Sequence, residues 1–440
     1  MRVRLKTGDL RDNSERHQID KNRLVRQGIL DSQFSASIVQ WTSPGRLIPI
    51  YAIGVVGAFL QIAGAQWDVS AHILGIVETF FTPAHTVLYI GIAMVAVASL
   101  SGLVLRSRSA AEQTIPPVLL KGLGIGLVGS AFQVIAAPID FWWHSTYGFD
   151  PFLFTPAHSL LIVGMIIGGA GMVIGSVRIF RAQRAGLQVP GTPRMAKLVP
   201  GIVILGLAAL WLQLNFFGYW ITDITGMAYT FGYCTIADFR AFQCPLVDSS
   251  GLASLVSFLL ASGIFATAGT IIFWTTKSLF HRRGIITIIA LVMAAVYSFA
   301  VLAFPAYELS FSNPPGSWYL ANTSPDQGTR LAFFIPIYLL SVIPVIVFDL
   351  LTKISMRRGI VLGLSALIGP FMALVDGRFT LGVSESNLDM AGIAILLFPL
   401  IVGGLGGWAL LNRMTHEIFP KISASDLMRS ERQDIRKRLK

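Results

Sequence analysis

Two short stretches of this chain carry the same potential metal ligands in the same order. The ligands are Asp68, His72 and His85 in the first copy and Asp140, His144 and His158 in the second. In each copy the aspartate lies four residues before a histidine. The sequence Phe-Thr-Pro-Ala-His then brings a second histidine, after a linker of twelve residues in the first copy and thirteen in the second. Two imidazoles and one carboxylate suit Cu(II), Zn(II) or non-haem Fe(II), and they leave coordination positions open, as catalytic sites do.

The spacing within each copy predicts how helices would bring these ligands together. Residues four apart lie on one face of a helix, so the aspartate and first histidine would project from neighbouring turns. In Thr-Pro-Ala-His, threonine is a favoured N-cap and proline a favoured first helical residue. His85 and His158 are therefore predicted to be the third residues of new helices.

A purely structural role is the alternative to metal binding, with each acid and its histidines forming only a hydrogen-bond network. The repetition of one acid and two histidines at nearly equal spacing favours a metal site, because such a set is hard to obtain twice for structural reasons alone. Ionisable residues within a membrane protein also indicate a functional site. Glu78 and Asp150 lie in the linkers. Each could accept a hydrogen bond that fixes a histidine tautomer, or each could be a solvated loop carboxylate.

The repeated pattern resembles the copper-site segment of the C subunit of the membrane-bound (particulate) methane and ammonia monooxygenases. That family has Asp-x3-His followed by Phe-Thr-Pro-Ser-His, and Trp143 and Asp150 match further positions of its motif in the second copy. The resemblance implies copper at the six repeated ligands, in an oxidoreductase or its metal-bearing subunit. This chain differs in having two copies, a longer second linker, and Ala84 and Ala157 where serine is usual.

The composition of the chain is typical of a polytopic membrane protein. Hydrophobic residues make up 54% of the 440 residues and charged residues only 13%, with a mean hydropathy of +0.66. Apolar runs of about 20 residues, the length that crosses a bilayer, begin near Leu47, Ala84, Ile115, Ala157, Leu198, Leu252, Ile285, Leu331, Ile360 and Ala391. The sequence therefore predicts an all-α protein with about ten transmembrane helices arranged as five helical hairpins.

The distribution of basic residues predicts the orientation of these helices. Only three of the 34 Lys and Arg residues, namely Arg240, Arg330 and Arg378, fall in the connections after odd-numbered runs. Both termini are therefore expected in the cytoplasm, and both metal motifs on the extracytoplasmic side of the plasma membrane. No cleavable signal peptide is expected at the N-terminus, because its first 45 residues are polar and basic. The net charge of +11 indicates contact with anionic lipid and not with nucleic acid.

The predicted organisation has four parts. Residues 1–45 form a basic cytoplasmic segment, residues 46–180 a four-helix unit with both motifs, residues 181–411 a six-helix membrane scaffold, and residues 412–440 a basic cytoplasmic tail. Cys234 and Cys244 lie in one outer loop of the scaffold. The oxidising side of the membrane permits a disulfide between them, although two unrelated thiols are the alternative.

The leading interpretation is an integral membrane metal-binding protein with extracytoplasmic sites, acting as an oxidoreductase or a monooxygenase-like subunit. Copper is expected from the resemblance, while zinc and non-haem iron fit the same ligands. One alternative is a membrane transporter or metal-handling permease, since repeated units are common among transporters. A second alternative is a non-catalytic scaffold subunit. Beyond the lipid bilayer, other membrane subunits are the expected partners, and the spacing leaves open whether the two motifs form one site or two.

Overall fold

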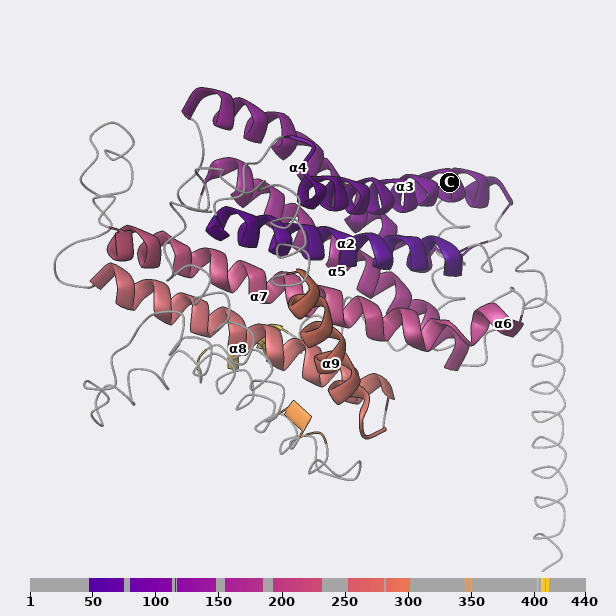
Figure 1. The fold of residues 1–440 in the computed structure, drawn as a ribbon. Helices are drawn as coiled ribbons and strands as arrows, with labels where there is room; N and C mark the ends of the chain where they lie inside the picture. The colour runs from indigo at the N-terminus through magenta and orange to yellow at the C-terminus, as the bar shows by residue number, and fades with distance from the viewer. Residues whose placement is uncertain are drawn as a thin grey trace, which may run out of the picture.

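The computed structural model describes residues 47–74, 80–112, 115, 117–147, 155–184, 193–231, 252–280 and 282–300, with a few positions between 345 and 410. Regular structure in these ranges is entirely helical (Figure 1). The helices are α2 (Leu47–Leu74), α3 (Pro83–Glu112), α4 (Pro117–Tyr147), α5 (Pro156–Arg184), α6 (Pro193–Ala196), α7 (Val199–Phe231), α8 (Leu252–Phe280) and α9 (Ile285–Ser298). The first seven predicted starts lie within two residues of observed helix starts. The last three lie outside the described residues.

Five of the described helices are long and apolar enough to cross a membrane. The qualifying segments are Leu47–Ala71, Pro83–Ser107, Pro117–Trp143, Pro156–Arg184 and Arg194–Gly218. Each contains 25 to 29 residues, and about 20 suffice to span the hydrocarbon core. The described part of the chain thus has the composition and helix lengths of a multi-pass membrane protein.

Helices α2 to α5 form a closed four-helix unit. Helix α2 packs on α3 and α4 packs on α5, while contacts between α3 and α4 and between α2 and α5 complete the ring. Helix α7 packs on α2 and α5, α8 packs on α7, and α9 crosses α7 (Figure 1). Helices α2 to α5 thus pack on one another, with α7 against α2 and α5.

The hairpins α2–α3 and α4–α5 repeat each other beyond the two metal motifs. Corresponding residues that are identical in the two copies include Gly54 and Gly126, Gly57 and Gly129, Gln61 and Gln133, Gly91 and Gly164, and Gly102 and Gly175. The glycines lie where helices touch. A Cβ on Gly57 would meet the carbonyl oxygen of Gly91 at 2.8 Å, and a Cβ on Gly129 would meet that of Gly164 at 2.5 Å. Both hairpins are thus closed by the same close backbone approach.

Contacts between the hairpins are also duplicated. Gly54 on α2 faces Met172 on α5. Gly126 on α4 corresponds to Gly54, Ser99 on α3 corresponds to Met172, and these two residues also face each other. In the same way Gly102 faces Leu123, and Gly175 faces Tyr51. Reciprocal contacts of this kind are typical of two units related by a two-fold axis. The four-helix unit therefore has an approximate internal two-fold axis running between the hairpins.

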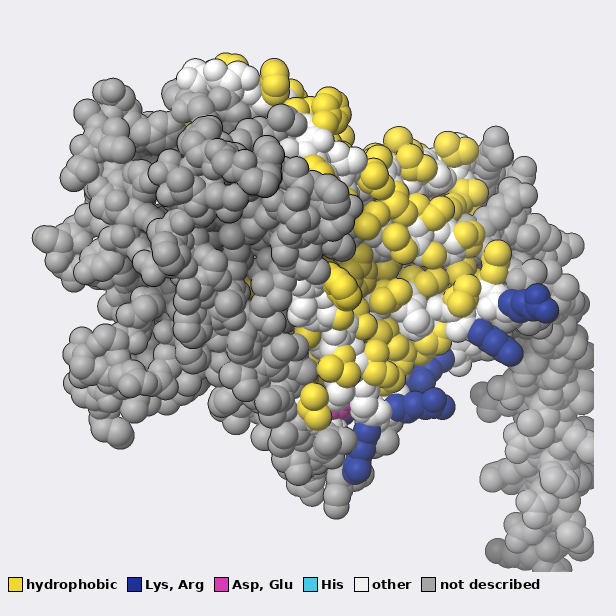
Figure 2. All heavy atoms as spheres, in the orientation of Figure 1, with side chains coloured by type: hydrophobic (Ala, Val, Ile, Leu, Met, Phe, Trp, Pro, Cys, Tyr) yellow, Lys and Arg dark blue, Asp and Glu magenta, His cyan; other side chains and the backbone are white. Residues whose placement is uncertain are grey.

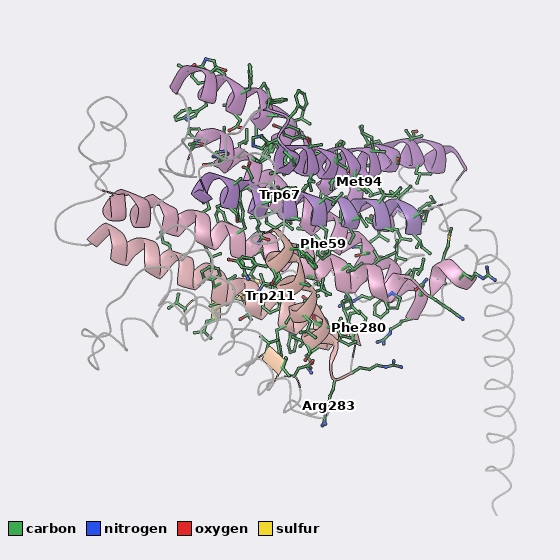
Figure 3. All side chains as sticks on the ribbon, viewed as in Figure 1. Phe59, Trp67, Met94, Trp211, Phe280 and Arg283 are labelled. Carbon is green, nitrogen blue, oxygen red and sulfur yellow. The ribbon has the colours of Figure 1, made fainter. Side chains whose placement is uncertain are left out.

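The end of the molecule that lies away from the metal motifs is basic. Figure 2 shows Lys and Arg side chains at one end of a surface that is otherwise largely hydrophobic. In Figure 3, Arg283 points outward at the turn between α8 and α9, far from Trp67, which precedes Asp68 on α2.

A buried aspartate joins three segments near this basic end. Asp349 is 0% exposed, and its Oδ1 lies 2.6 Å from Nζ of Lys277 near the end of α8. Its Oδ2 accepts hydrogen bonds of 3.1 Å from the backbone nitrogen and the hydroxyl of Thr287, in the first turn of α9. The carboxylate thereby fixes the end of α8, the start of α9 and residue 349 together.

Candidate metal centres

The local structure places the repeated ligands where the sequence predicts them. Helices α2 and α4 extend past both residues of each Asp-x3-His pair, and α3 and α5 begin at Pro83 and Pro156. His85 and His158 are therefore the third residues of their helices, as predicted. In the second copy the hydroxyl of Thr155 accepts a 3.2 Å hydrogen bond from the backbone nitrogen of His158, which confirms the predicted N-cap.

The cap of the first copy differs from the prediction. The carbonyl oxygen of Thr82 accepts the backbone hydrogen bond from Thr86 at 2.8 Å, which starts the helical pattern. The Thr82 hydroxyl is buried and has no hydrogen-bond partner among the described residues. Helix α3 therefore begins at the predicted residue without the predicted side-chain cap.

The first hairpin brings Asp68 and His85 into direct contact. The Nε2 atom of His85 lies 2.9 Å from Oδ1 of Asp68, and the two side chains are only 13% and 10% exposed. The aspartate lies near the end of α2 and the histidine in the first turn of α3. The connection between the two helices therefore brings the two side chains together. The carboxylate and the imidazole thus share a small space that is largely shielded from solvent.

The second hairpin forms the corresponding pair from Asp140 and His158. Here Nε2 of His158 lies 3.3 Å from Oδ1 of Asp140, with side-chain exposures of 9% and 19%. Each pair belongs to a single hairpin. The structure therefore places the described ligands in two separate pairs related by the internal two-fold axis, and it does not combine aspartate from one copy with histidine from the other.

The separations within the two pairs fit either an ordinary hydrogen bond or two ligands of one metal ion. Imidazole nitrogen and carboxylate oxygen atoms bind such metals at about 2.0 to 2.1 Å, so two ligand atoms lie roughly 2.9 to 3.4 Å apart for angles between a right angle and a tetrahedral one. The observed separations of 2.9 and 3.3 Å fall in that range.

The remaining predicted site residues are placed only in part. His72 and His144 lie on α2 and α4, one turn beyond the aspartates, but their side chains lie outside the described part. Consistent with this, the described side chains include no group of three or more His, Cys, Asp or Glu residues that could hold a metal. Four other predicted residues also fall outside the described ranges, namely Glu78, Asp150, Cys234 and Cys244.

A row of aromatic rings begins at His85 of the first pair and reaches the second hairpin. The ring of Tyr89 stacks on the imidazole of His85, with centroids 5.8 Å apart and planes 22° apart. Phe80 packs against Tyr89 at 5.2 Å and against Phe141 at 5.6 Å. Phe141 is the residue after Asp140, so this chain of rings joins the surroundings of the two pairs.

Two glutamines below the pairs were missed by sequence reasoning. Gln61 and Gln133 are each 0% exposed, and each lies seven residues before the aspartate of its copy, two turns deeper on the same helix face. Among the described residues, neither Nε2 nor Oε1 of Gln61 has a hydrogen-bond partner, and Oε1 of Gln133 has none. Their identical positions relative to the two aspartates are the signal that could have revealed them.

The geometry thus offers two acid–imidazole pairs, each with one buried and one partly exposed member, at corresponding positions of a duplicated membrane hairpin, and each has a buried glutamine beneath it. Comparisons with protein-family models, with curated proteins and with solved structures find no match for this chain.

Proposed function

We propose that this chain is a multi-pass membrane protein that binds two metal ions, one in each hairpin of its four-helix unit. The observation that carries the proposal is the repetition of one geometry, because Asp68 with His85 and Asp140 with His158 meet at 2.9 and 3.3 Å in corresponding positions. His72 and His144, one turn beyond the aspartates, would supply the third ligands.

The proposed metal is copper, and the proposed role is that of an oxidoreductase or its metal-bearing subunit. Copper follows from the resemblance of both motifs to the monooxygenase segment, since the ligand types alone fit zinc and iron equally. Bound there, copper would supply redox chemistry next to an open coordination position. The residues of the chain would hold the ion, orient the imidazoles through the carboxylates, and limit the access of water.

The proposed topology has about ten transmembrane helices, with both termini in the cytoplasm and both pairs on the extracytoplasmic side. The five described apolar helices support the membrane location. The described Lys and Arg side chains gather at one end of the molecule (Figure 2), and Arg283 lies far from Trp67, the residue before Asp68 (Figure 3), which supports the proposed orientation. Anionic lipid would contact that basic end, and other membrane subunits could contact helices beyond the four-helix unit.

Metal content of the purified, detergent-solubilised full chain tests this function. Wild type, His85→Ala and His158→Ala would be exposed separately to copper, iron and zinc, and the bound metal counted by mass spectrometry. We expect two copper ions per wild-type chain and one in each variant. A folded wild-type protein that retains no metal would contradict the proposal, as would variants that retain both ions.

A metal-handling permease is the second candidate, and the buried glutamines favour it. Gln61 and Gln133 place polar groups inside the bundle below each pair, where a transported ion would need them. Uptake of radioactive copper into vesicles containing the protein would distinguish the two functions. Uptake abolished by Gln61→Leu would support transport, and uptake equal to that of empty vesicles would exclude it.

A further inference from the structure

Gln133 is an uncharged polar residue in the interior of the membrane-spanning part of α4. It is 0% exposed, lies seven residues before Asp140, and falls within the apolar segment Pro117–Trp143. Its side chain extends towards α5, because a Cβ on Gly164 would meet Cγ of Gln133 at 2.7 Å. A polar group left unpaired in the hydrocarbon region of a bilayer is strongly destabilising. The hydrogen bonds of this amide therefore have to be accounted for completely.

The amide of Gln133 uses only part of its hydrogen-bonding capacity within the described part of the chain. Nε2 donates one hydrogen bond of 3.3 Å to the carbonyl oxygen of Gly129, one turn earlier on the same helix. Oε1 has no partner among the described residues. Since a glutamine amide has two N–H groups and an oxygen with two lone pairs, one N–H group and the oxygen remain for another molecule.

Gly168, a buried residue of α5, leaves room beside this amide. Among the described residues, a Cβ added to Gly168 would have two atoms within 4 Å, Nε2 of Gln133 and Cγ1 of Val95, each at 3.6 Å. Both are ordinary van der Waals distances. At Gly164 and Gly171 of the same helix, an added Cβ would instead lie 2.7 and 2.6 Å from atoms of α4. The buried face of α5 therefore has space for one small group at Gly168.

The internal two-fold axis places this space in the middle of the four-helix unit. Val95 of α3 corresponds to Gly168 of α5, since each lies ten residues after the Thr-Pro-Ala-His histidine of its copy. The two positions contact each other, so the axis passes between them. The first hairpin thus carries an isopropyl group at the position where the second carries only a hydrogen atom.

We propose that the space beside Gly168 binds a water molecule that pairs with the Gln133 amide, whether or not the chain holds a metal. Water can accept from the second N–H group of Nε2 and donate to an oxygen, whereas a metal cation could not pair with the N–H group. The carbonyl oxygen of Gly164, four residues before Gly168, is a second partner. The Ser130 hydroxyl reaches the carbonyl oxygen of Gly126 over the same spacing, at 3.0 Å. Two to four such partners hold a buried water.

Substitutions at Gly168 test the site through unfolding of the full chain by sodium dodecyl sulfate in mixed micelles. The Cβ of Gly168→Ala fits the space, so a dry site predicts a variant at least as stable as Gly124→Ala, where helix propensity acts alone. Displacement of a water predicts the opposite, because alanine cannot replace its hydrogen bonds. We expect the unfolding equilibrium constant of Gly168→Ala to exceed that of Gly124→Ala by about fivefold or more. Gly168→Ser, whose hydroxyl can take the place of the water, should recover most of this loss.

A double-mutant cycle separates the water from a steric effect of the added methyl group. Gln133→Met removes the amide and keeps an unbranched side chain of similar length. In that background Gly168→Ala should be no less stable than Gly124→Ala, because no amide remains to be left unpaired. A destabilisation by Gly168→Ala that persists unchanged beside Gln133→Met would overturn the proposal.

Solid-state nuclear magnetic resonance of the full chain in lipid bilayers would detect the water directly. Polarisation transfer from water protons to Nε2 of Gln133, assigned by the loss of its signal in Gln133→Met, is expected in wild type and should disappear in Gly168→Ala. A wild-type spectrum without this transfer would overturn the proposal, as would a Gly168→Ala protein as stable as Gly124→Ala. If Gly168→Ala does not fold, the wild-type spectrum decides, with loss of the transfer in Gly168→Ser as its control.

Discussion

The substitution Gly129→Ala tests how the second hairpin is held together. Gly129 on α4 faces the backbone of α5, and a Cβ there would meet the carbonyl oxygen of Gly164 at 2.5 Å and Cα of Gly168 at 2.7 Å. The nitrogen of Gly168 lies in the same direction. Every neighbour belongs to the backbone of the opposing helix, so no side chain can rotate away to make room.

The cost follows from the distance that α5 would have to move. Ordinary van der Waals contact begins at 3.4 Å, so the helices must separate by about 1 Å. Overpacking of this kind costs about 1 to 3 kcal/mol. Alanine also has a higher helix propensity than glycine, which stabilises the folded state by about 1 kcal/mol and offsets part of this cost. Gly124→Ala on the same helix isolates that second effect, because a Cβ there would have nothing within 4 Å.

Unfolding by sodium dodecyl sulfate in mixed micelles, followed by circular dichroism, would measure both variants. We expect Gly124→Ala to equal or exceed wild type and Gly129→Ala to fall below Gly124→Ala by about 1 to 3 kcal/mol. Gly57→Ala in the first hairpin should lose less, since the nearest contacts of its added Cβ are longer, at 2.8 to 3.0 Å. A Gly129→Ala protein as stable as Gly124→Ala would refute the close helix contact.

Three further predictions use the same unfolding measurement. Asp349→Ala should lose about 3 to 5 kcal/mol, because Lys277, which is only 14% exposed, would keep a charge without its partner; a loss below about 1 kcal/mol would contradict this. Tyr51→Phe should lose about 1 kcal/mol, because the buried hydroxyl donates a 2.7 Å hydrogen bond to the carbonyl oxygen of Leu119. Gln61→Leu should stabilise the protein, because it removes a buried amide that has no hydrogen-bond partner among the described residues. A destabilised variant would contradict this and show that the Gln61 amide forms hydrogen bonds in the folded protein.

The sequence predicts the helices well because their signals are local. Hydrophobic runs of sufficient length and the Thr-Pro pairs at 82–83 and 155–156 place the first seven helix starts, those in the described residues, within two residues of the observed ones. The position of His85 and His158 in the first turn of a helix follows from the same residues. Even here one local detail was wrong, because only Thr155 caps its helix through its hydroxyl.

The arrangement between helices was not predictable to the same degree. The spacing leaves open whether the two sets of ligands converge, because that depends on which helices touch. The decisive residues are small ones such as Gly91 and Gly164, which lie far along the chain from the backbone that they meet. Aromatic contacts such as Phe80 with Phe141 likewise join different hairpins. Close approach and ring packing of this kind depend on three-dimensional position, which hydropathy and charge do not specify.

The duplicated unit allows each site to be compared with a related site in the same chain. The two copies share the aspartates, the histidines, the interhelical glycines and the buried glutamines, which are the groups that set donor chemistry and helix spacing. They differ beside the metal pairs, where Tyr89 corresponds to Ile162 and Val69 corresponds to Phe141. The duplication therefore preserved the acid, the imidazole and the spacing of the helices, while the side chains next to the aspartate and one turn after the histidine changed.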